Sequence, residues 1–287
     1  MKASIVVITY NEEVNIKSCL ESLTQQDYSD YELLVIDAST DRTAEIASSF
    51  KNANVIKTPQ KGFGLQRNIG IQLSQGDYIA FTDADCIAPQ NWLSNAISSL
   101  NHHQAAGVGG NAYPPLDSPK IGIIIACLGY PAGGAVGLDP VKDPLSTCNA
   151  VFLTSALKQV NGFNEQLIYG GEDTDLCKKL NSSGYKTFID PTLFVYHKTR
   201  DPKEFLNWNI RRGKAKYHLN KSPLQILMPL AVFVYPFTRK YRKVVSKRSA
   251  LGLTLKDILI TLPCFFFLRQ LYLTKGWIQE FNRSRLE

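Results

Sequence analysis

The chain has 287 residues, of which 44% are hydrophobic and 20% charged, as in an ordinary globular protein of one large or two smaller domains. Its six cysteines include no Cys-x-x-Cys pair, which speaks against a zinc site or a disulfide framework and favours a reducing compartment. The net charge is +7, with Lys and Arg concentrated in residues 198–248, so nucleic acid, anionic lipid and phosphorylated substrates are the partner classes to consider.

The first hundred residues alternate between short apolar runs, typical of buried strands, and segments whose apolar residues have helical spacing. The predicted strands are residues 4–9, 31–36, 54–57 and 78–81, and the predicted helices are residues 14–25, 41–50, 62–76 and 91–100. This alternation predicts a parallel sheet with right-handed crossovers, the nucleotide-binding half of a doubly wound fold. Because no Gly-x-Gly-x-x-Gly follows the first strand, we expect no dinucleotide cofactor.

Two carboxylates follow the fourth predicted strand directly. Asp83 and Asp85 therefore lie at the carboxyl end of a central strand, the edge at which open α/β sheets bind their ligands. Oxygen ligands favour Mg²⁺ or Mn²⁺, which can also bridge substrate phosphates. The alternative at this point is that both are solvated turn residues.

The middle of the chain is rich in Gly and Pro from residue 107 to 145, which predicts a long lid or acceptor loop over this edge. A strand over residues 147–154 and a short helix over 155–160 follow. Gly171-Glu172-Asp173 then leads into a helix that stops at Gly184. Short strands are predicted at residues 186–189 and 193–196, with His197 directly after them.

The last third contains two apolar segments, residues 223–237 and 258–273, each interrupted by proline. Neither offers the roughly 20 uncharged residues expected of a spanning helix. The basic residues of 239–248 lie between them. Apolar faces beside basic clusters predict helices that lie in a membrane interface, and the alternative is that these segments pack on the catalytic core.

Five motifs occur in a fixed order: Ile8-Thr9-Tyr10-Asn11-Glu12, Asp37-Ala38-Ser39-Thr40-Asp41, Arg67-Asn68, Asp83-Ala84-Asp85 and Gly171-Glu172-Asp173. In this order the chain resembles a family 2 glycosyltransferase over about residues 1–215. The resemblance implies the α/β GT-A fold, a Rossmann-like, mainly parallel mixed sheet flanked by helices. It divides the catalytic domain, 1–215, into a nucleotide-binding half, 1–106, and an acceptor half, 107–215, and leaves 216–287 as an apolar, basic, helical, membrane-associating tail.

The resemblance also implies roles for single residues. Those expected to hold the nucleotide-sugar are Thr9, Asn11, Glu12, Asp37, Arg67, Asp83 and Arg212, of which Arg212 would clamp the diphosphate. Asp85 would ligate Mn²⁺ or Mg²⁺, and His197 resembles a family histidine at the metal or diphosphate. The second motif departs from the usual Asp-Asp-Gly-Ser: only Asp37 remains of it, so the contacts to the base are not carried over in detail.

The implied reaction moves a sugar from a nucleotide-diphospho-sugar to an acceptor hydroxyl. A divalent cation would neutralise the leaving diphosphate, and a carboxylate must take the acceptor's proton. Asp173 is the expected base, with Glu172 raising its pKa or holding the acceptor. Attack opposite the leaving group inverts the anomeric centre. We expect a glycan or lipid-linked acceptor of the cell envelope at the cytoplasmic face of the membrane, since no signal peptide begins the sequence.

Two other functions compete with this prediction. A sugar nucleotidyltransferase would carry a glycine-rich, basic first turn, and Tyr10-Asn11-Glu12-Glu13 has neither feature. A non-catalytic membrane or nucleic-acid-binding module would account for the basic residues 198–248, but not for acids gathered at strand ends. We therefore expect no nucleic-acid partner.

Overall fold

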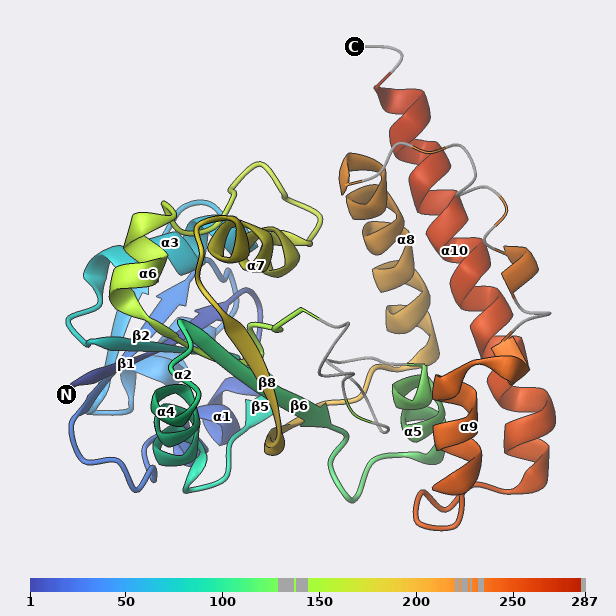
Figure 1. Cartoon of the computed structure of the whole chain (residues 1–287), viewed down its shortest axis with the longest axis horizontal. Coiled ribbons are helices and arrows are strands. Elements are labelled where there is room, and N and C mark those ends of the chain that lie inside the picture. The colour runs from blue at the N-terminus through green and yellow to red at the C-terminus, as the bar shows by residue number, and fades with distance from the viewer. Residues whose placement is uncertain are drawn as a thin grey trace. The chain divides into compact units, whose positions relative to one another are not determined.

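The computed structural model describes residues 1–128, 137, 144–219, 222, 227, 229–231 and 235–284. The chain forms two compact units (Figure 1). Unit 1 comprises residues 1–112, 138–168 and 172–197, and unit 2 comprises residues 113–137, 169–171 and 198–287.

Unit 1 is built on an eight-stranded mixed sheet with the strand order β3-β2-β1-β4-β7-β6-β8-β5. The strands are β1 (Ala3–Thr9), β2 (Tyr31–Asp37), β3 (Ala53–Lys57), β4 (Tyr78–Asp83), β5 (Cys86–Ile87), β6 (Gly107–Tyr113), β7 (Asn149–Leu153) and β8 (Thr187–His197). The first four strands pair in parallel, whereas β7 runs antiparallel to β4 and β6. In the register, Thr9 is opposite Asp37 and Ile8 is opposite Asp83, so the polar strand ends meet at one edge, as the sequence predicted.

Helices cover both faces of this sheet. They are α1 (Ile16–Leu23), α2 (Thr43–Ser48), α3 (Phe63–Leu73), α4 (Trp92–His102), α6 (Thr154–Gln159) and α7 (Glu172–Ser182). Figure 1 shows α3, α6 and α7 on one face and α1 and α4 on the other. Beneath α3, α6 and α7, alternate strand residues such as Ile79 and Phe81 form a continuous apolar core, with the Phe81 ring edge-on to Phe152 and Phe163.

The prediction of a loop throughout residues 107–145 was wrong, because β6 and α5 (Lys120–Cys127) occupy part of it. The glycines of β6 are needed for close packing: a Cβ on Gly107 would lie 2.5 Å from the Phe152 ring, and one on Gly110 would lie 2.2 Å from the Leu193 carbonyl oxygen. A glycine-rich strand therefore looks like a loop in the sequence. The remainder of the predicted lid, residues 129–136 and 138–143, lies outside the described residues.

The two short strands predicted after α7 are one continuous strand, β8, which includes Pro191. The carbonyl of Pro191 accepts a hydrogen bond from Asn111 Nδ2. Asp190 accepts hydrogen bonds from the backbone N–H and hydroxyl of Thr192, which stabilise the chain on the other side of the proline. These side-chain hydrogen bonds stabilise the backbone on both sides of Pro191, so the strand continues through a residue that has no N–H to donate.

Unit 2 is helical, with α5, α8 (Pro202–Leu219), the 3₁₀ turn η3 (Tyr235–Phe237), α9 (Arg239–Ser246), the π-helical turn η4 (Asp257–Thr261) and α10 (Leu262–Arg283). Helices α8 and α10 pack closely: a Cβ on Gly213 would lie 2.0 Å from the Leu273 carbonyl oxygen, and one on Gly276 would lie 1.9 Å from that of Ile210. Trp277 of α10 is buried.

The expectation that the second apolar segment is too short for a spanning helix does not hold by length and composition. Residues Asp257–Arg283 form one helix of 27 residues, long and apolar enough by composition to cross a membrane, a property that core helices of soluble proteins share. Pro263 lies in the first turn of α10, directly after the π-helical turn, where its missing N–H is tolerated. Arg269 lies beside the face of the Phe266 ring, with its guanidinium carbon 5.9 Å from the centroid.

Candidate active site

The first part of the site lies at the carboxyl ends of β1 and β2. The Thr9 hydroxyl donates to Asp37 Oδ1 at 2.5 Å, and both side chains are buried. Gln66 on α3 donates from Nε2 to the carbonyl oxygens of Thr9 and Ile36, at 2.9 and 2.8 Å, and so ties the two strand ends together. Sequence reasoning missed Gln66, because a glutamine in a helix is ordinarily exposed and carries no signal of such a contact.

The turn after β1 is held by hydroxyl groups from the segment after β2. Asn11 has a positive φ of 57°, and its Oδ1 accepts from the backbone N–H of Thr40 at 2.9 Å. Its own backbone N–H donates to Ser39 Oγ at 2.8 Å, and that of Glu12 donates to Thr43 Oγ1 at 2.8 Å. The residues that depart from the usual family motif therefore position the turn in which Asn11 and Glu12 lie.

Arg67 on α3 links two acids from different parts of the chain. Its side chain is 4% exposed, with Nη1 2.7 Å from Glu172 Oε1 and Nη2 3.2 Å from Asp83 Oδ1. Asp83 ends β4 and Glu172 begins α7. A buried guanidinium needs such partners, so this contact places the start of α7 against the acidic end of the sheet.

Glu172 and Asp173 stand in the first turn of α7, where the helix dipole favours negative charge. Burial raises the pKa of Glu172, the charge of Arg67 opposes that rise, and the charge of Asp173 adds to it. Glu172 Oε2 is buried and accepts no hydrogen bond from the residues that the structure describes. Asp173 is half-buried, and its Oδ1 accepts from the backbone N–H of Thr174 at 2.7 Å, which sets the orientation of the carboxylate.

Asp85, Cys86 and His197 form the group that could hold a metal ion. Their ligand atoms lie within 4.8 Å of one another, and His197 Nε2 is 3.4 Å from Asp85 Oδ1 and 3.9 Å from Asp83 Oδ2. The antiparallel pairing of β5 with β8 creates this group, because it sets Cys86 opposite His197. Carboxylate oxygen and imidazole nitrogen suit Mn²⁺ or Mg²⁺, so the donor set fits the expected cation.

Cys86 is a member of this group that the sequence did not indicate. Burial raises the pKa of the Cys86 thiol well above its usual range, and the neighbouring Cys148 thiol adds to the rise. A metal ligand must be a thiolate, so the Cys86 side chain is a poor ligand for a hard cation at neutral pH. The roles of Asp85 and His197 as metal ligands stay a prediction.

Two further residues, Asn149 and the predicted Arg212, lie outside this group. The amide of Asn149 accepts from Trp92 Nε1 and donates to the Asn111 carbonyl oxygen, both at 2.8 Å, so this residue supports the sheet rather than reaching for substrate. Arg212 belongs to α8 in unit 2, where its guanidinium carbon lies 4.7 Å from the centroid of the Trp208 ring. Its expected contact with a diphosphate stays a prediction.

The fold and sequence were compared with known proteins. The profile of "Glycosyl transferase family 2" matches residues 4–126, and that of "N-terminal domain of galactosyltransferase" matches residues 142–201. Glycosyltransferase AglE of Haloferax volcanii is 30% identical over 255 residues, which cover 80% of this chain and 79% of that protein. A dolichyl N-acetyl-alpha-D-glucosaminyl phosphate 3-beta-D-2,3-diacetamido-2,3-dideoxy-beta-D-glucuronosyltransferase of Methanococcus voltae is 26% identical over 74% of this chain and 72% of its own length.

Solved structures share the architecture. The mannosyltransferase PcManGT of Pyrobaculum calidifontis, solved with GDP-Man and Mn²⁺, aligns with a TM-score of 0.67 at 18% identity, over 98% of this chain and 87% of its own. Staphylococcus aureus TarS 1–349, in complex with UDP-GlcNAc, aligns with a TM-score of 0.54 at 18% identity. The alignment covers 100% of this chain and 92% of the TarS chain. The mixed, mainly parallel sheet with helices on both faces is thus the GT-A fold of glycosyltransferases. The chain belongs to glycosyltransferase family 2.

Proposed function

We propose that this glycosyltransferase moves a sugar, with inversion, from a nucleotide-diphospho-sugar to the hydroxyl of a glycan or lipid-linked acceptor. The observation that carries the proposal is the position of Arg67, which contacts Asp83 and Glu172 at once. Through it, the acids at the strand ends and the acids that begin α7 form one connected group. That arrangement suits a donor bound at the strand ends and an acceptor bound at the start of α7, because the reacting atoms must be held close together.

The donor half of the proposal rests on the ends of the parallel strands. Side chains expected to hold the nucleotide-sugar there are Thr9, Asn11, Glu12, Asp37, Arg67 and Asp83. Asp85 and His197 would hold Mn²⁺ or Mg²⁺, which neutralises charge on the leaving diphosphate. Arg212 would add a bidentate contact to that diphosphate. The complexes of PcManGT with GDP-Man and Mn²⁺ and of TarS with UDP-GlcNAc support a donor of this class.

The acceptor half rests on Asp173. Its carboxylate, oriented by the backbone N–H of Thr174, is positioned to take the proton of the attacking hydroxyl. Attack on the face opposite the leaving diphosphate inverts the anomeric carbon. Glu172 is engaged by Arg67, so it positions the start of α7, and its buried Oε2 has no hydrogen-bond partner among the described residues.

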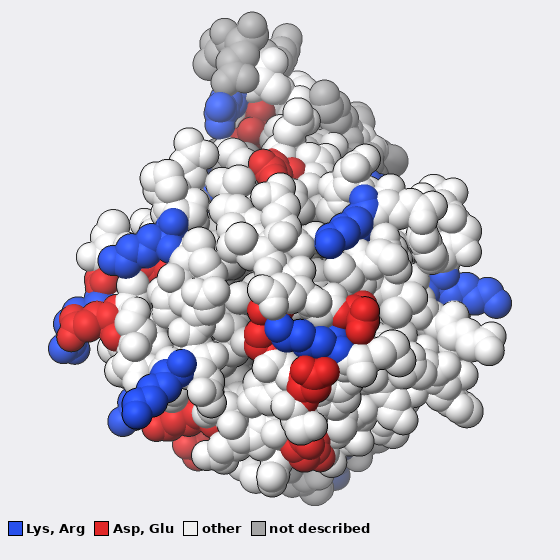
Figure 2. All heavy atoms as spheres, turned by 90° about the vertical axis from the view of Figure 1, so that its left-hand side faces the viewer, with Lys and Arg blue, Asp and Glu red and all other residues white. Residues whose placement is uncertain are grey.

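We further propose that residues 1–215 are the catalytic domain, with a nucleotide-binding half over 1–106 and an acceptor half over 107–215, and that 216–287 attach it to a membrane. Residues 198–287 contain 19 Lys and Arg against 5 Asp and Glu. On the face of unit 1 that Figure 2 shows, acids and bases are instead interspersed, so the excess of positive charge belongs to residues 198–287. A cationic segment of this kind is attracted to the anionic cytoplasmic leaflet.

The apolar surface of α10 supports the same attachment. Ile260 of η4 and Phe267, Leu271 and Ile278 of α10 are exposed, and their spacing of seven, four and seven residues places them along one side of the continuous 27-residue helix. The exposed basic residues Arg242, Lys243, Lys247 and Arg248 lie in or just after α9, which packs against the start of α10 through Tyr241 and Val244. The name of the M. voltae relative includes a dolichyl phosphate sugar, which fits a lipid-linked acceptor at this surface.

A donor screen tests the reaction. Full-length protein is incubated with GDP-mannose, UDP-N-acetylglucosamine and other nucleotide-sugars, with Mn²⁺, Mg²⁺ or a chelator, and release of nucleoside diphosphate is measured. We expect one donor class to be hydrolysed or transferred, and the chelator to stop the release. If no nucleotide-sugar is turned over or bound with either cation, the proposed function is wrong. NMR of the linkage formed reports retention or inversion directly.

A further inference from the structure

A second concave region of unit 1 extends along α7, away from the nucleotide edge. It is a cavity of about 740 Å³, in the size range of sites that bind small molecules. Thr174, Cys177, Lys178 and Asn181 line it from α7. Because these residues are spaced by three, one and three positions, they share one face of the helix, and the cavity follows that face from the first turn to the last.

The lining is basic. Lys178 and Lys186 contribute exposed ammonium groups, and neither forms an ion pair within the described part of the chain. The cavity's lining, as far as the structure describes it, includes no Asp or Glu. The adjacent Lys179 differs, because its ammonium donates to the Gly162 carbonyl oxygen. The two lysines of the cavity are therefore available to an anion from solution.

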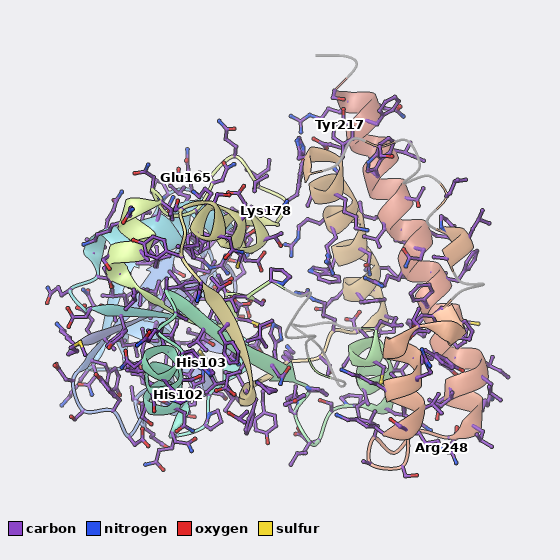
Figure 3. All side chains as sticks on the ribbon, in the orientation of Figure 1. His102, His103, Glu165, Lys178, Tyr217 and Arg248 are labelled. Carbon is purple, nitrogen blue, oxygen red and sulfur yellow. The ribbon has the colours of Figure 1, made fainter. Side chains whose placement is uncertain are left out.

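Ring surfaces complete the lining. His103, just after α4, stacks on Phe188 of β8 with ring centroids 3.7 Å apart, and Tyr185 lies between α7 and β8. Figure 3 labels Lys178 on α7 and His103 at the end of α4. Half-exposed aromatic surface beside hydrogen-bonding and cationic groups suits sugar rings that carry charged substituents.

One end of this cavity is joined to the catalytic residues by the chain itself. Thr174 lines the cavity and also donates its backbone N–H to Asp173, the proposed base. A glycan whose terminal hydroxyl reached Asp173 could place its preceding sugars along the same helix face. Lys178 lies one turn along α7 from Thr174, and Lys186 lies after the end of the helix, directly before β8.

We propose that this cavity binds the acceptor glycan, and that the acceptor carries anionic groups, carboxylates or phosphates, on the sugars that precede the reacting one. The proposal rests on the proposed function for its acceptor role. It assigns Lys178 and Lys186 to recognition of the acceptor and gives them no part in binding the donor.

Calorimetric titration of full-length protein with three probes tests the proposal. The probes are tetragalacturonate as a carboxylate glycan, mannose 6-phosphate as a phosphorylated sugar, and the neutral maltotetraose. We expect at least one anionic probe to bind and maltotetraose not to bind, and the two anionic probes to reveal which group is preferred. Because the lysines are exposed, the affinity should fall as salt is added. Maltotetraose binding as tightly as both anionic probes would overturn the assignment of charge.

Matched variants locate the binding. Lys178→Glu with Lys186→Glu should weaken the anionic probe by roughly tenfold or more, since two attractive charges become repulsive. Lys17→Glu with Lys51→Glu makes the same change in net charge on unit 1, away from the cavity lining, and should change affinity by less than about twofold. Amide hydrogen exchange should show protection in residues 174–189 on binding. Equal losses in the two double variants would overturn the proposal.

Nucleotide binding separates this inference from the proposed function. In the same preparations, Mn²⁺-dependent binding of nucleoside diphosphate should be equal in the wild type and the Lys178→Glu, Lys186→Glu variant. A protein that binds the nucleotide but none of the anionic probes would overturn the inference while the function stands. Binding of an anionic probe in a protein that binds no nucleotide-sugar would overturn the acceptor role.

Discussion

Arg67 Nη1 lies 2.7 Å from Glu172 Oε1, although the two residues are 105 positions apart in the chain. Both side chains are almost fully buried, and the same guanidinium contacts Asp83. The pair therefore determines where α7, and with it Asp173, lies relative to the acidic end of β4. It joins two motifs that the sequence presents as separate.

Removal of Arg67 should destabilise the protein strongly. Arg67→Met leaves Glu172 buried without its charged partner, which we expect to lower the free energy of unfolding by about 3–5 kcal/mol. The double variant Arg67→Met with Glu172→Gln should recover most of that loss, because no unpaired buried charge then remains; the Asp83 carboxylate, which also loses Arg67, is 31% exposed to water. Chemical denaturation of the three proteins measures the effect. A loss below about 1 kcal/mol in the single variant would contradict a buried, structural ion pair.

The metal assignment predicts different outcomes for two neighbouring residues. Asp85→Ala should abolish Mn²⁺-dependent binding of nucleoside diphosphate and leave the fold intact, since the residue supplies the proposed carboxylate ligand. Cys86→Ser should leave that binding within about twofold, because burial keeps the thiol protonated and hence a poor ligand. Calorimetric titration with and without Mn²⁺ tests both. Loss of Mn²⁺-dependent binding in Cys86→Ser would show that Cys86 Sγ is a metal ligand.

Asp173→Asn should reduce turnover by roughly 10²–10⁴-fold, the range for loss of a positioned general base. The donor's dissociation constant should hardly change, because the residue is proposed to face the acceptor. Asp175→Asn is the matched control, since Asp175 is another acid of the same helical turn and has no proposed catalytic role. Near-normal turnover by a folded Asp173→Asn protein would transfer the base role to another group.

The stability of unit 2 should depend on pH through Asp257. This residue lies at the start of the long C-terminal helix, where the Lys120 ammonium donates to it at 2.7 Å and Thr254 donates from its backbone N–H and hydroxyl. These contacts lower its pKa to about 2. A carboxyl whose folded pKa is depressed stabilises the fold above its unfolded pKa, about 4, and loses that contribution as pH falls toward 2.

The test compares the wild type with Asp257→Asn in urea. The wild type should be the more stable at pH 7, and the difference should shrink as the pH falls from about 4 toward 2, because the unfolded state takes up the proton before the folded state does. A difference that stays constant from pH 7 to pH 3 would show that the Asp257–Lys120 ion pair contributes nothing to stability.

Membrane attachment should depend on the exposed side of α10. Deletion of residues 222–287 is a poor test, because α10 packs tightly on α8 at Gly213 and Gly276. Ile260→Ser, Phe267→Ser and Leu271→Ser together should instead release the full-length protein from vesicles that contain phosphatidylglycerol, because they remove apolar surface without touching that contact. Co-sedimentation with the vesicles measures the release.

Three exposed apolar residues of unit 1 provide the control for this experiment. Val14→Ser, Leu73→Ser and Ile168→Ser together replace three apolar residues that are 45–78% exposed, against 38–56% for the three residues of the C-terminal helix. Vesicle binding should persist in that variant and weaken with salt, since each basic residue near an anionic surface contributes about 1 kcal/mol. If the wild type ignores anionic vesicles, the membrane proposal is wrong.

Much of unit 1 could be predicted from the sequence by itself. Apolar runs at 4–9, 31–36 and 78–81 produced β1, β2 and β4, because periodicity and turn residues act over a few neighbours. Parallel pairing then placed the residues that follow those strands at one edge, which is why Asp37, Asp83 and Asp85 were identified as candidates. The order of the motifs was sufficient to indicate the family, which the comparisons confirmed.

Contacts between distant segments were decided only by the tertiary structure. Strand β6 shows no apolar pattern in the sequence, because its glycines are required where Phe152 and Leu193 fill the space of a Cβ. Gln66 and Cys86 became part of the site through strand pairing and helix packing, which single-residue patterns do not encode. The Arg67–Glu172 pair joins residues 105 positions apart, and the low-dielectric surroundings that make its charges depend on one another exist only once the chain has folded.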